Sequence, residues 1–254
     1  MLKPKIGFLF DVDGTLTTFK RNDSVVDLLI INDLELIRKK KHPIGLVTGR
    51  GVDWVRNFFF NHINETLREY ILIFGEYGLV NWYKGKKIRK QIKKEIKENL
   101  FLAKDEFTKE ICEYLELESY VSYEAPDKRS LWIEPKELMI TYRSLPFFGL
   151  IPERFLKIIN PILEKYSDTL KAYVSEQALD ILPVKESKKT AAEKAIRILD
   201  PNKEIELWYA FGDSESDEDM ALARNGNVKF FKIETSMTSD LHRIIQKILA
   251  GGTF

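Results

Sequence analysis

Cysteine is nearly missing from this chain of 254 residues, because Cys112 is its single thiol. One thiol excludes an internal disulfide and any zinc site built from several cysteines, and it suits a reducing compartment. Long apolar runs are missing as well, since no stretch approaches the roughly 18 residues that a membrane-spanning helix needs. The first apolar run ends at Asp11 and Asp13, so we expect no signal peptide. These absences predict a soluble, cytoplasmic protein without a membrane partner.

The sequence also lacks an excess of either charge. Lys and Arg total 40 and Asp and Glu total 39, which leaves a formal net charge of +1. This balance argues against a dedicated nucleic-acid binder, because such proteins rely on long-range attraction to phosphates. Hydrophobic residues make up 44% of the chain and charged residues 31%, which excludes the disordered classes. At about 150 residues per domain, the length predicts one or two globular domains.

Both ends of the chain alternate between apolar runs and helical patterns. The apolar runs are residues 6–10, 43–47, 71–74 and 207–211, and the helical patterns are 24–41, 52–70 and 190–199. Runs that are apolar throughout are typical of strands covered on both faces. The alternation predicts an α/β fold with a doubly wound, Rossmann-like parallel sheet.

The middle of the chain has a different pattern. We expect charged helical structure over residues 88–117 and a further helix over 152–165. Short strands are expected at 119–122, 130–134, 138–142, 170–175 and 178–182. Neighbouring strands without crossover helices indicate an antiparallel α+β unit inserted into the α/β domain. We therefore predict core segments at 1–82 and 185–254 and an inserted domain at 83–184, whose basic stretch 84–97 is interpreted as a solvated helix face.

Polar residues follow the ends of three apolar runs. Asp11 and Asp13 follow the first run, the triplet Thr-Gly-Arg at 48–50 follows the second, and Asp213 follows the last. Reactive groups collect at the carboxyl ends of parallel strands, so these side chains meet in one cleft if the strands are neighbours. Side-chain alternation places Asp11 and Asp13 on the same side, and Gly14 permits the sharp turn that follows.

This set of residue types suits phosphoryl chemistry. Mg²⁺ binds one or two carboxylates together with a substrate phosphate, and an aspartate can attack phosphorus to form an aspartyl phosphate. A second carboxylate can protonate the leaving oxygen and later activate water. Thr48 and Lys188 are candidate donors to the phosphoryl oxygens. Each motif taken alone also fits a turn or a helix cap, so the joint placement at strand ends carries the interpretation.

Four motifs in this order resemble those of the haloacid dehalogenase-like (HAD) hydrolase superfamily. Residues 11–16 (DVDGTL) match its first motif, DxDGT[L/V], and residues 47–50 (VTGR) look like its second. Lys188 lies where the third-motif lysine precedes a helix, and residues 211–217 (FGDSESD) look like the fourth motif, GDxxxD. The motifs span nearly the whole chain.

The resemblance implies a role for each matching residue. Asp11 would be the nucleophile and Asp13 the general acid and base. Asp213 would hold Mg²⁺ together with the Asp11 carboxylate and the Asp13 backbone carbonyl, with Asp217 in or near the outer shell of the metal. The phosphoryl group would be bound by Thr48, Gly49, Arg50 and Lys188. Lys185 and Lys189 are close in sequence, and Lys188 is favoured because Ser187 precedes it and the helical pattern starts just after.

The insert corresponds in position to a C2 cap, and its αββ-αββ pattern looks like the type B subclass, which includes phosphatases acting on sugar phosphates. The resemblance implies a phosphatase acting on a small phosphate ester, with the cap setting substrate choice. A phosphomutase sharing these motifs stays open, since it would return the phosphoryl group to a sugar instead of water. A receiver-like signalling module is disfavoured, because such domains are about half this length and lack an acid two residues after the phosphorylated aspartate.

Overall fold

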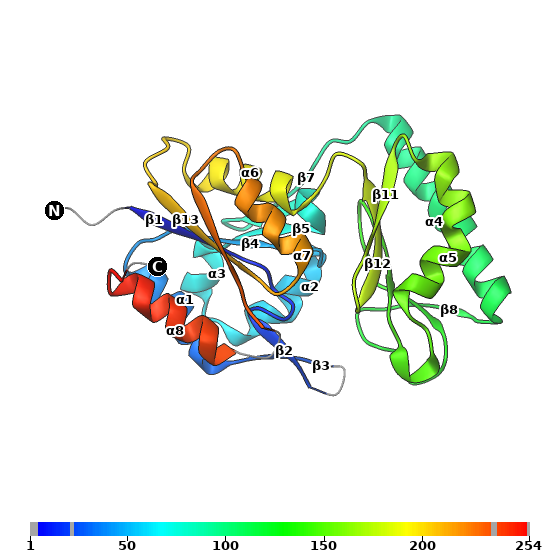
Figure 1. Cartoon of the computed structure of the whole chain (residues 1–254), viewed down its shortest axis with the longest axis horizontal. Coiled ribbons are helices and arrows are strands. Elements are labelled where there is room, and N and C mark those ends of the chain that lie inside the picture. The colour runs from blue at the N-terminus through cyan, green and yellow to red at the C-terminus, as the bar shows by residue number, and fades with distance from the viewer. Residues whose placement is uncertain (1–4, 21–22, 235–237, 253–254) are drawn as a thin grey trace. The chain divides into compact units, whose positions relative to one another are not determined.

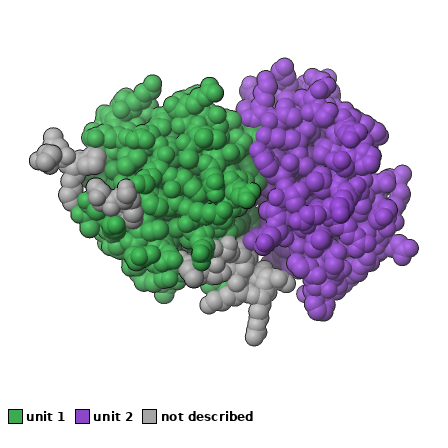
Figure 2. Space-filling model, viewed as in Figure 1, with its two compact units in different colours: residues 1–89, 186–254 green, residues 90–185 purple. Residues whose placement is uncertain are grey.

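The computed structural model describes residues 5–20, 23–234 and 238–252. The chain forms two compact units, one made of residues 1–89 and 186–254 and the other of residues 90–185 (Figure 2). The second unit is therefore an insertion into the first. The strand β7 (Lys86–Arg89), which the sequence prediction placed in the inserted domain, lies in the first unit.

The first unit is built on a seven-stranded sheet with the strand order β14-β13-β1-β4-β5-β6-β7. The five strands from β14 to β5 run parallel, and β6 and β7 are antiparallel to their neighbours. The strands are β1 (Ile6–Phe10), β4 (Ile44–Val47), β5 (Leu72–Gly75), β6 (Val80–Tyr83), β7, β13 (Leu207–Gly212) and β14 (Val228–Lys232). Every residue of β1, β4 and β5 is buried, as a sheet covered on both faces requires. The predicted parallel α/β core is confirmed.

Helices cover both faces of this sheet. Figure 1 shows α1 and α8 next to each other on one face and α6 on the other. Ala191, Ala192 and Ala195 of α6 lie against the sheet, and their small side chains let the helix approach the strands closely. The helical segments are α1 (Leu28–Lys39), α2 (Val52–Asn57), η1 (Phe59–His62), α3 (Glu65–Tyr70), η2 (Glu76–Gly78), α6 (Lys188–Leu199), α7 (Glu215–Glu218), η5 (Asp219–Leu222) and α8 (Thr238–Leu249).

Three local predictions are wrong. The helix expected over 52–70 is broken into α2, η1 and α3, because Asn64 caps a new helix by accepting a hydrogen bond from the Leu67 amide. The helix expected from residue 24 begins at Leu28, since β3 (Asp23–Val26) pairs with β2 (Thr17–Lys20). The basic stretch 84–97 is mainly a strand and a loop, with Gly85 at φ +77° in the turn between β6 and β7.

The second unit is an α+β structure, as predicted. Its five-stranded sheet has the order β11-β12-β10-β9-β8, and all pairs are antiparallel except β8 with β9. Helices α4 and α5 bury Phe107, Ile111 and Phe155 in one core with the apolar side chains of the sheet. The elements are α4 (Lys94–Leu115), β8 (Ser119–Val121), β9 (Leu131–Ile133), β10 (Ile140–Arg143), η3 (Pro146–Phe148), α5 (Pro152–Leu163), η4 (Glu164–Tyr166), β11 (Leu170–Val174) and β12 (Ala178–Pro183).

None of the helices in the described ranges combines the length and the apolar character needed to cross a bilayer.

Candidate active site

The carboxyl ends of three adjacent strands bring the predicted residues together. The Asp11 amide donates to the Phe211 carbonyl (2.8 Å), so the β1–β13 pairing extends one residue beyond β1. The Thr48 amide donates to the Phe74 carbonyl (2.9 Å) in the same way at the end of β4. Backbone pairing therefore fixes the first polar residue of each loop at the sheet edge.

Three carboxylates form a cluster at this edge. Asp11, Asp213 and Asp217 each offer an oxygen that lies within 4.8 Å of the others. Gly14 makes room for the cluster, since its φ is +74° and a Cβ atom there would lie 1.9 Å from Asp213 Oδ2. A Cβ atom at Gly212 would lie 2.2 Å from the Asp217 Cβ. Both motif glycines are required because a carboxylate occupies the space that a side chain would take.

Lys188 reaches the cluster from the first turn of α6. Its ammonium forms ion pairs with Asp11 and with Asp217 Oδ1 (2.7 Å) and donates to the Val47 carbonyl (2.9 Å). The helix starts at this residue because Ser187 and Thr190 form a reciprocal capping box. Lys185 is exposed and Lys189 is partly exposed, whereas Lys188 is buried. Of these three lysines, the structure brings Lys188 to the carboxylates.

Burial is the largest single influence on the pKa of each buried group in the cluster, and neighbouring charges oppose it. It raises the pKa of Asp11 well above the usual range of an aspartate, although the Lys188 ammonium opposes this shift. Burial alone would lower the pKa of Lys188, but the Asp11 and Asp217 carboxylates outweigh it and raise that pKa. Burial likewise acts to raise the pKa of Asp217, but the Lys188 ammonium and the hydrogen bonds from Ser214 together outweigh it and hold that pKa below its usual value. The Lys188 ammonium therefore forms ion pairs with two buried carboxylates at once.

Arg50 is paired with Asp13. Its guanidinium donates to both carboxylate oxygens, from Nε at 2.7 Å and from Nη2 at 3.0 Å, and stacks over the Trp54 ring at 4.1 Å. The Arg50 side chain is 5% exposed and the Asp13 side chain 20%, so the pair lies at the boundary between the buried cluster and solvent. The two-point contact fixes the orientation of the Asp13 carboxylate. The structure thus places Arg50 on the predicted acid and base, whereas the sequence predicted it as a phosphate ligand.

Thr48 lies in a loop that hydrogen bonds of the backbone hold in place. Its hydroxyl accepts from the Arg50 amide (3.1 Å), and its carbonyl accepts from the Tyr77 amide (3.1 Å). The bracing turn has Glu76 and Tyr77 at positive φ, which is uncommon for residues other than glycine. Gly49 lies within this same loop, so the predicted triplet 48–50 is held at the end of β4.

Ser214 and Thr15, two residues within the matched motifs, were not predicted as site residues. Ser214 donates from its hydroxyl (2.6 Å) and its amide (3.0 Å) to Asp217 Oδ2, which anchors that carboxylate. The signal is a serine three residues before an acid, a spacing typical of a capping box. Thr15 is fully buried, and its hydroxyl has no hydrogen-bond partner among the described residues.

The fold and this edge define an α/β protein with an inserted α+β domain and an Asp-x-Asp site at the end of the first strand. The family model described as haloacid dehalogenase-like hydrolase matches residues 8–224, and the chain belongs to this family. The resemblance inferred from the four motifs is therefore confirmed, and the insertion stands where a C2 cap is expected.

Solved structures with the same fold cover nearly the whole chain. The trehalose-6-phosphate phosphatase of Aspergillus fumigatus (crystal form 2) is 15% identical at a TM-score of 0.57, over 98% of this chain and 94% of its own. A haloacid dehalogenase-like hydrolase from Bacteroides thetaiotaomicron is 14% identical at a TM-score of 0.63, over 97% and 100%. The IMP-nucleotidase of Plasmodium falciparum, solved as a mutant with bound IMP, is 11% identical at a TM-score of 0.62, over 96% and 68%. No curated protein matches the sequence. At these identities the structural neighbours establish the fold alone.

Proposed function

We propose that this protein is a phosphatase that hydrolyses a small phosphate monoester, with a sugar phosphate as its substrate, through an aspartyl phosphate on Asp11. One observation carries the proposal: Asp11 is buried beside Lys188, and the Asp13 carboxyl two residues later is oriented by a two-point contact with Arg50. The pair provides a nucleophile next to a cation and a separate acid and base, the two functions that hydrolysis in two steps requires.

In the first step, a carboxylate oxygen of Asp11 attacks phosphorus and forms a new P–O bond. The bond from phosphorus to the leaving oxygen breaks, and Asp13 gives that oxygen a proton. In the second step, water attacks the aspartyl phosphate, Asp13 takes a proton from it, and the bond between phosphorus and Asp11 breaks to release inorganic phosphate. Lys188 and Thr48 are proposed to hold the phosphoryl oxygens through both steps.

The residues present fit a divalent cation at Asp11, Asp213 and Asp217. Three carboxylates against one ammonium leave a formal charge of −2 on the cluster when all four groups are ionised. A purely oxygen donor set is the one that Mg²⁺ prefers, and we propose Mg²⁺ as the ion. When bound, such an ion neutralises charge on the phosphoryl oxygens and orients the ester.

The choice of a sugar phosphate rests on the resemblance of the insert to the type B cap, whose subclass includes phosphatases acting on sugar phosphates. Structures named for a sugar phosphatase and for a nucleotidase both match the fold, so the experiment below compares both classes of ester.

The test is a panel of sugar phosphates, nucleoside monophosphates and p-nitrophenyl phosphate, scored by release of inorganic phosphate as kcat/KM with Mg²⁺ and with EDTA. We expect the highest kcat/KM for a sugar phosphate and none with EDTA. Trapping of a phosphoryl group on Asp11, located by mass spectrometry, would support the intermediate. Isomerisation of a sugar phosphate without phosphate release would overturn the hydrolase proposal in favour of a mutase.

Metal binding has a readout that does not depend on activity. At an Mg²⁺ concentration of about 100 times Kd, the free energy of unfolding should rise by roughly 2.7 kcal/mol. The rise should be lost in Asp213→Asn and kept in Asp53→Asn, because Asp53 is a partly exposed acid that pairs with Lys87. An equal rise in both variants would contradict the metal site.

A further inference from the structure

A cavity of about 580 Å³ lies at the other edge of the same sheet. Its wall includes Ile6 at the start of β1, Pro43 just before β4, and Ile205 just before β13. These positions are the amino ends of the parallel strands, so the cavity is separated from the Asp11 cluster by the length of β1. Its volume falls within the range of small-molecule pockets.

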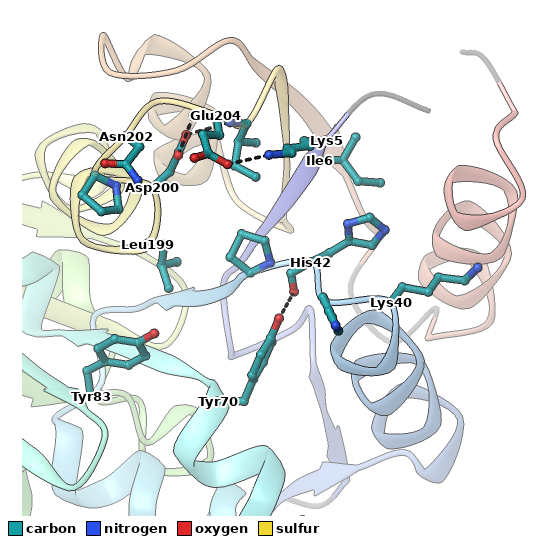
Figure 3. Close-up of a pocket in the computed structure, with 14 residues that line it drawn as sticks. Lys5, Ile6, Lys40, His42, Tyr70, Tyr83, Leu199, Asp200, Asn202 and Glu204 are labelled. Carbon is teal, nitrogen blue, oxygen red and sulfur yellow. Dashed lines mark hydrogen bonds and ion pairs between the residues drawn. The ribbon is translucent and has the colours of Figure 1, made fainter. Parts of the chain in front are cut away.

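Two kinds of side chain line the cavity on opposite sides. Figure 3 shows the rings of Tyr70 and Tyr83 on one side and the polar groups of Asp200, Asn202 and Glu204 on the other, with Leu199 between them. Two aromatic rings beside an aliphatic side chain are typical of a site for a flat apolar group. A ring of one or two cycles is therefore the first part of the ligand that this cavity suits.

The wall is preformed by hydrogen bonds. Asp200 accepts from the amides of Glu204 (2.7 Å) and Ile205 (2.9 Å), which holds the loop between α6 and β13 in place. The Tyr70 hydroxyl donates to the His42 carbonyl (3.1 Å), which fixes one of the two rings against the loop after α1. A site that exists before binding loses little conformational entropy when a ligand enters.

The charges at the rim favour an anion. Lys5 is paired with Glu204 (2.5 Å), and the acidic Asp200 is engaged by backbone amides. The ammonium groups of Lys40 and Lys41 have no ion-pair partner among the residues that the structure describes. Lys40 extends outward in Figure 3, and its flexible four-carbon stem can turn toward an anion at the mouth of the cavity. Two lysines on one loop thus supply the positive charge that a ligand would meet.

We propose that this amino-edge cavity binds a small aromatic anion, whose ring lies among Tyr70, Tyr83 and Leu199 and whose negative group meets Lys40 and Lys41. The site is distinct from the proposed catalytic edge. Its ligand need not be a phosphate ester, because no nucleophile or acid pair of the Asp11 and Asp13 type lines the cavity among the described residues.

The test uses the full chain and indole-3-carboxylate, an aromatic anion that carries no phosphate. Binding is measured by calorimetry, with the neutral indole-3-carboxamide as the matched ligand. We expect saturable binding of the carboxylate and weaker binding of the amide. Absence of saturation at about 10 mM, where even a millimolar site would fill, would overturn the proposal.

The variants assign the binding to the cavity. Lys40→Gln combined with Lys41→Asn should raise the Kd of indole-3-carboxylate by about fivefold. The expected change is small because exposed charge pairs are individually weak. Asparagine suits the positive φ of Lys41. Lys39→Gln, at the last residue of α1, is the matched control because Lys39 does not line the cavity. Tyr83→Leu should raise the Kd of both ligands by roughly tenfold, because the contact between aromatic rings is lost. Unchanged affinity in the lysine double variant would overturn the assignment even if Tyr83→Leu fails to fold.

Discussion

The parallel strands of the seven-stranded sheet end at one edge, the carboxyl edge, and begin at the other, the amino edge. Charged side chains form a buried cluster at the first edge and a solvent-exposed pair at the second. At the carboxyl edge, Asp11, Asp217 and Lys188 are buried, and Lys188 forms an ion pair with each of the two aspartates. At the amino edge, Lys5 and Glu204 form an ion pair whose side chains are 62% and 53% exposed. The same strands thus end in a desolvated cluster at one edge and in a solvated pair at the other.

The direction of the chain accounts for this difference. At the carboxyl edge, the loop after β12 runs into the N-terminus of α6, whose first residue is Lys188, and the amide groups of such a helix start favour anions. At the amino edge, α1 and α6 end, and the carbonyl groups of helix ends favour cations such as Lys39 and Lys40. These helix-end preferences do not decide every position, since the cation Lys188 begins α6 and the acid Asp200 follows its last residue.

The comparison also distinguishes residues that we expect to act in catalysis from residues that we expect to stabilise the fold. Burying charges costs free energy that an apolar cluster would not lose, so a buried set of acids around one lysine is weak evidence for stability and better evidence for function. The amino edge has no comparable cluster within the described ranges, and its one buried acid, Asp200, accepts from backbone amides. Substitutions at the two edges should therefore change different quantities.

The largest effect is expected from Asp11→Asn. The amide cannot form the aspartyl phosphate, so kcat for p-nitrophenyl phosphate should fall by at least about 10⁴-fold. Asp53→Asn is the control, because Asp53 is a partly exposed carboxylate in the same unit. Hydrolysis by Asp11→Asn at the wild-type rate would contradict the assignment of Asp11 as the nucleophile. The proposed difference in function between the two edges would then also be wrong.

Lys188→Met should change both activity and stability. Removing the ammonium leaves Asp11 and Asp217 buried without their cation, which should cost about 3–5 kcal/mol of unfolding free energy in EDTA. Activity should fall by roughly 10²-fold, in line with the loss of one preorganised donor to the phosphoryl group. The control is Lys189→Met, one residue further along α6. Equal effects of the two variants would contradict the assignment of Lys188.

Arg50→Lys distinguishes two roles for the guanidinium. If Arg50 orients Asp13 as an acid, the loss should be roughly 10²-fold for an alkyl phosphate, whose leaving oxygen needs a proton, and much smaller for p-nitrophenyl phosphate. Asp13→Asn should show the same dependence on the leaving group. Equal losses for both esters would instead support the sequence prediction that Arg50 binds the phosphoryl group.

The carboxyl edge was predictable because its signals are local. The sequence predicted Asp11, Thr48 and Asp213 at strand ends, and parallel pairing of β1 with β4 and β13 places these ends at one edge of the sheet, where Asp11 and Asp213 lie in one cluster. The pairing of Arg50 with Asp13 was not predictable, since it depends on a side chain that crosses between two loops and stacks on Trp54. Local sequence also gave no sign that β7 continues the core sheet, because a short basic strand at a sheet edge resembles an exposed helix.

The amino-edge cavity could not be predicted from the sequence. Tyr70 and Leu199 are more than 100 positions apart, and nothing in the spacing of either helix indicates that their ends line one space. The loop that closes the cavity depends on Asp200 accepting from two amides, which is a property of a conformation and not of a motif.

Asp200→Asn tests the amino edge by stability. The charged acceptor of two backbone amides becomes a neutral one, which should lower the unfolding free energy by about 1.5–3 kcal/mol in urea denaturation. Glu204→Gln on the same loop is the control and should change it little, because its ion pair with Lys5 is exposed. Hydrolysis by Asp200→Asn should be unchanged, and a loss of kcat at full stability would show that the two edges are coupled.

The smallest expected effect is the contribution of His42, at the amino edge, to the pH dependence of the unfolding free energy. Burial, aided by the nearby Lys40 ammonium, lowers the pKa of His42 in the folded protein, so the unfolded chain takes up a proton at higher pH. Below the unfolded pKa of about 6.5, the unfolded state therefore binds more protons and stability falls as the pH decreases. In His42→Gln this component is absent, and the difference in unfolding free energy between wild type and variant should shift in favour of the variant from pH 8 to pH 5. Because the two proteins share all other titrating groups, a constant difference across that range would show that His42 does not link the amino edge to pH.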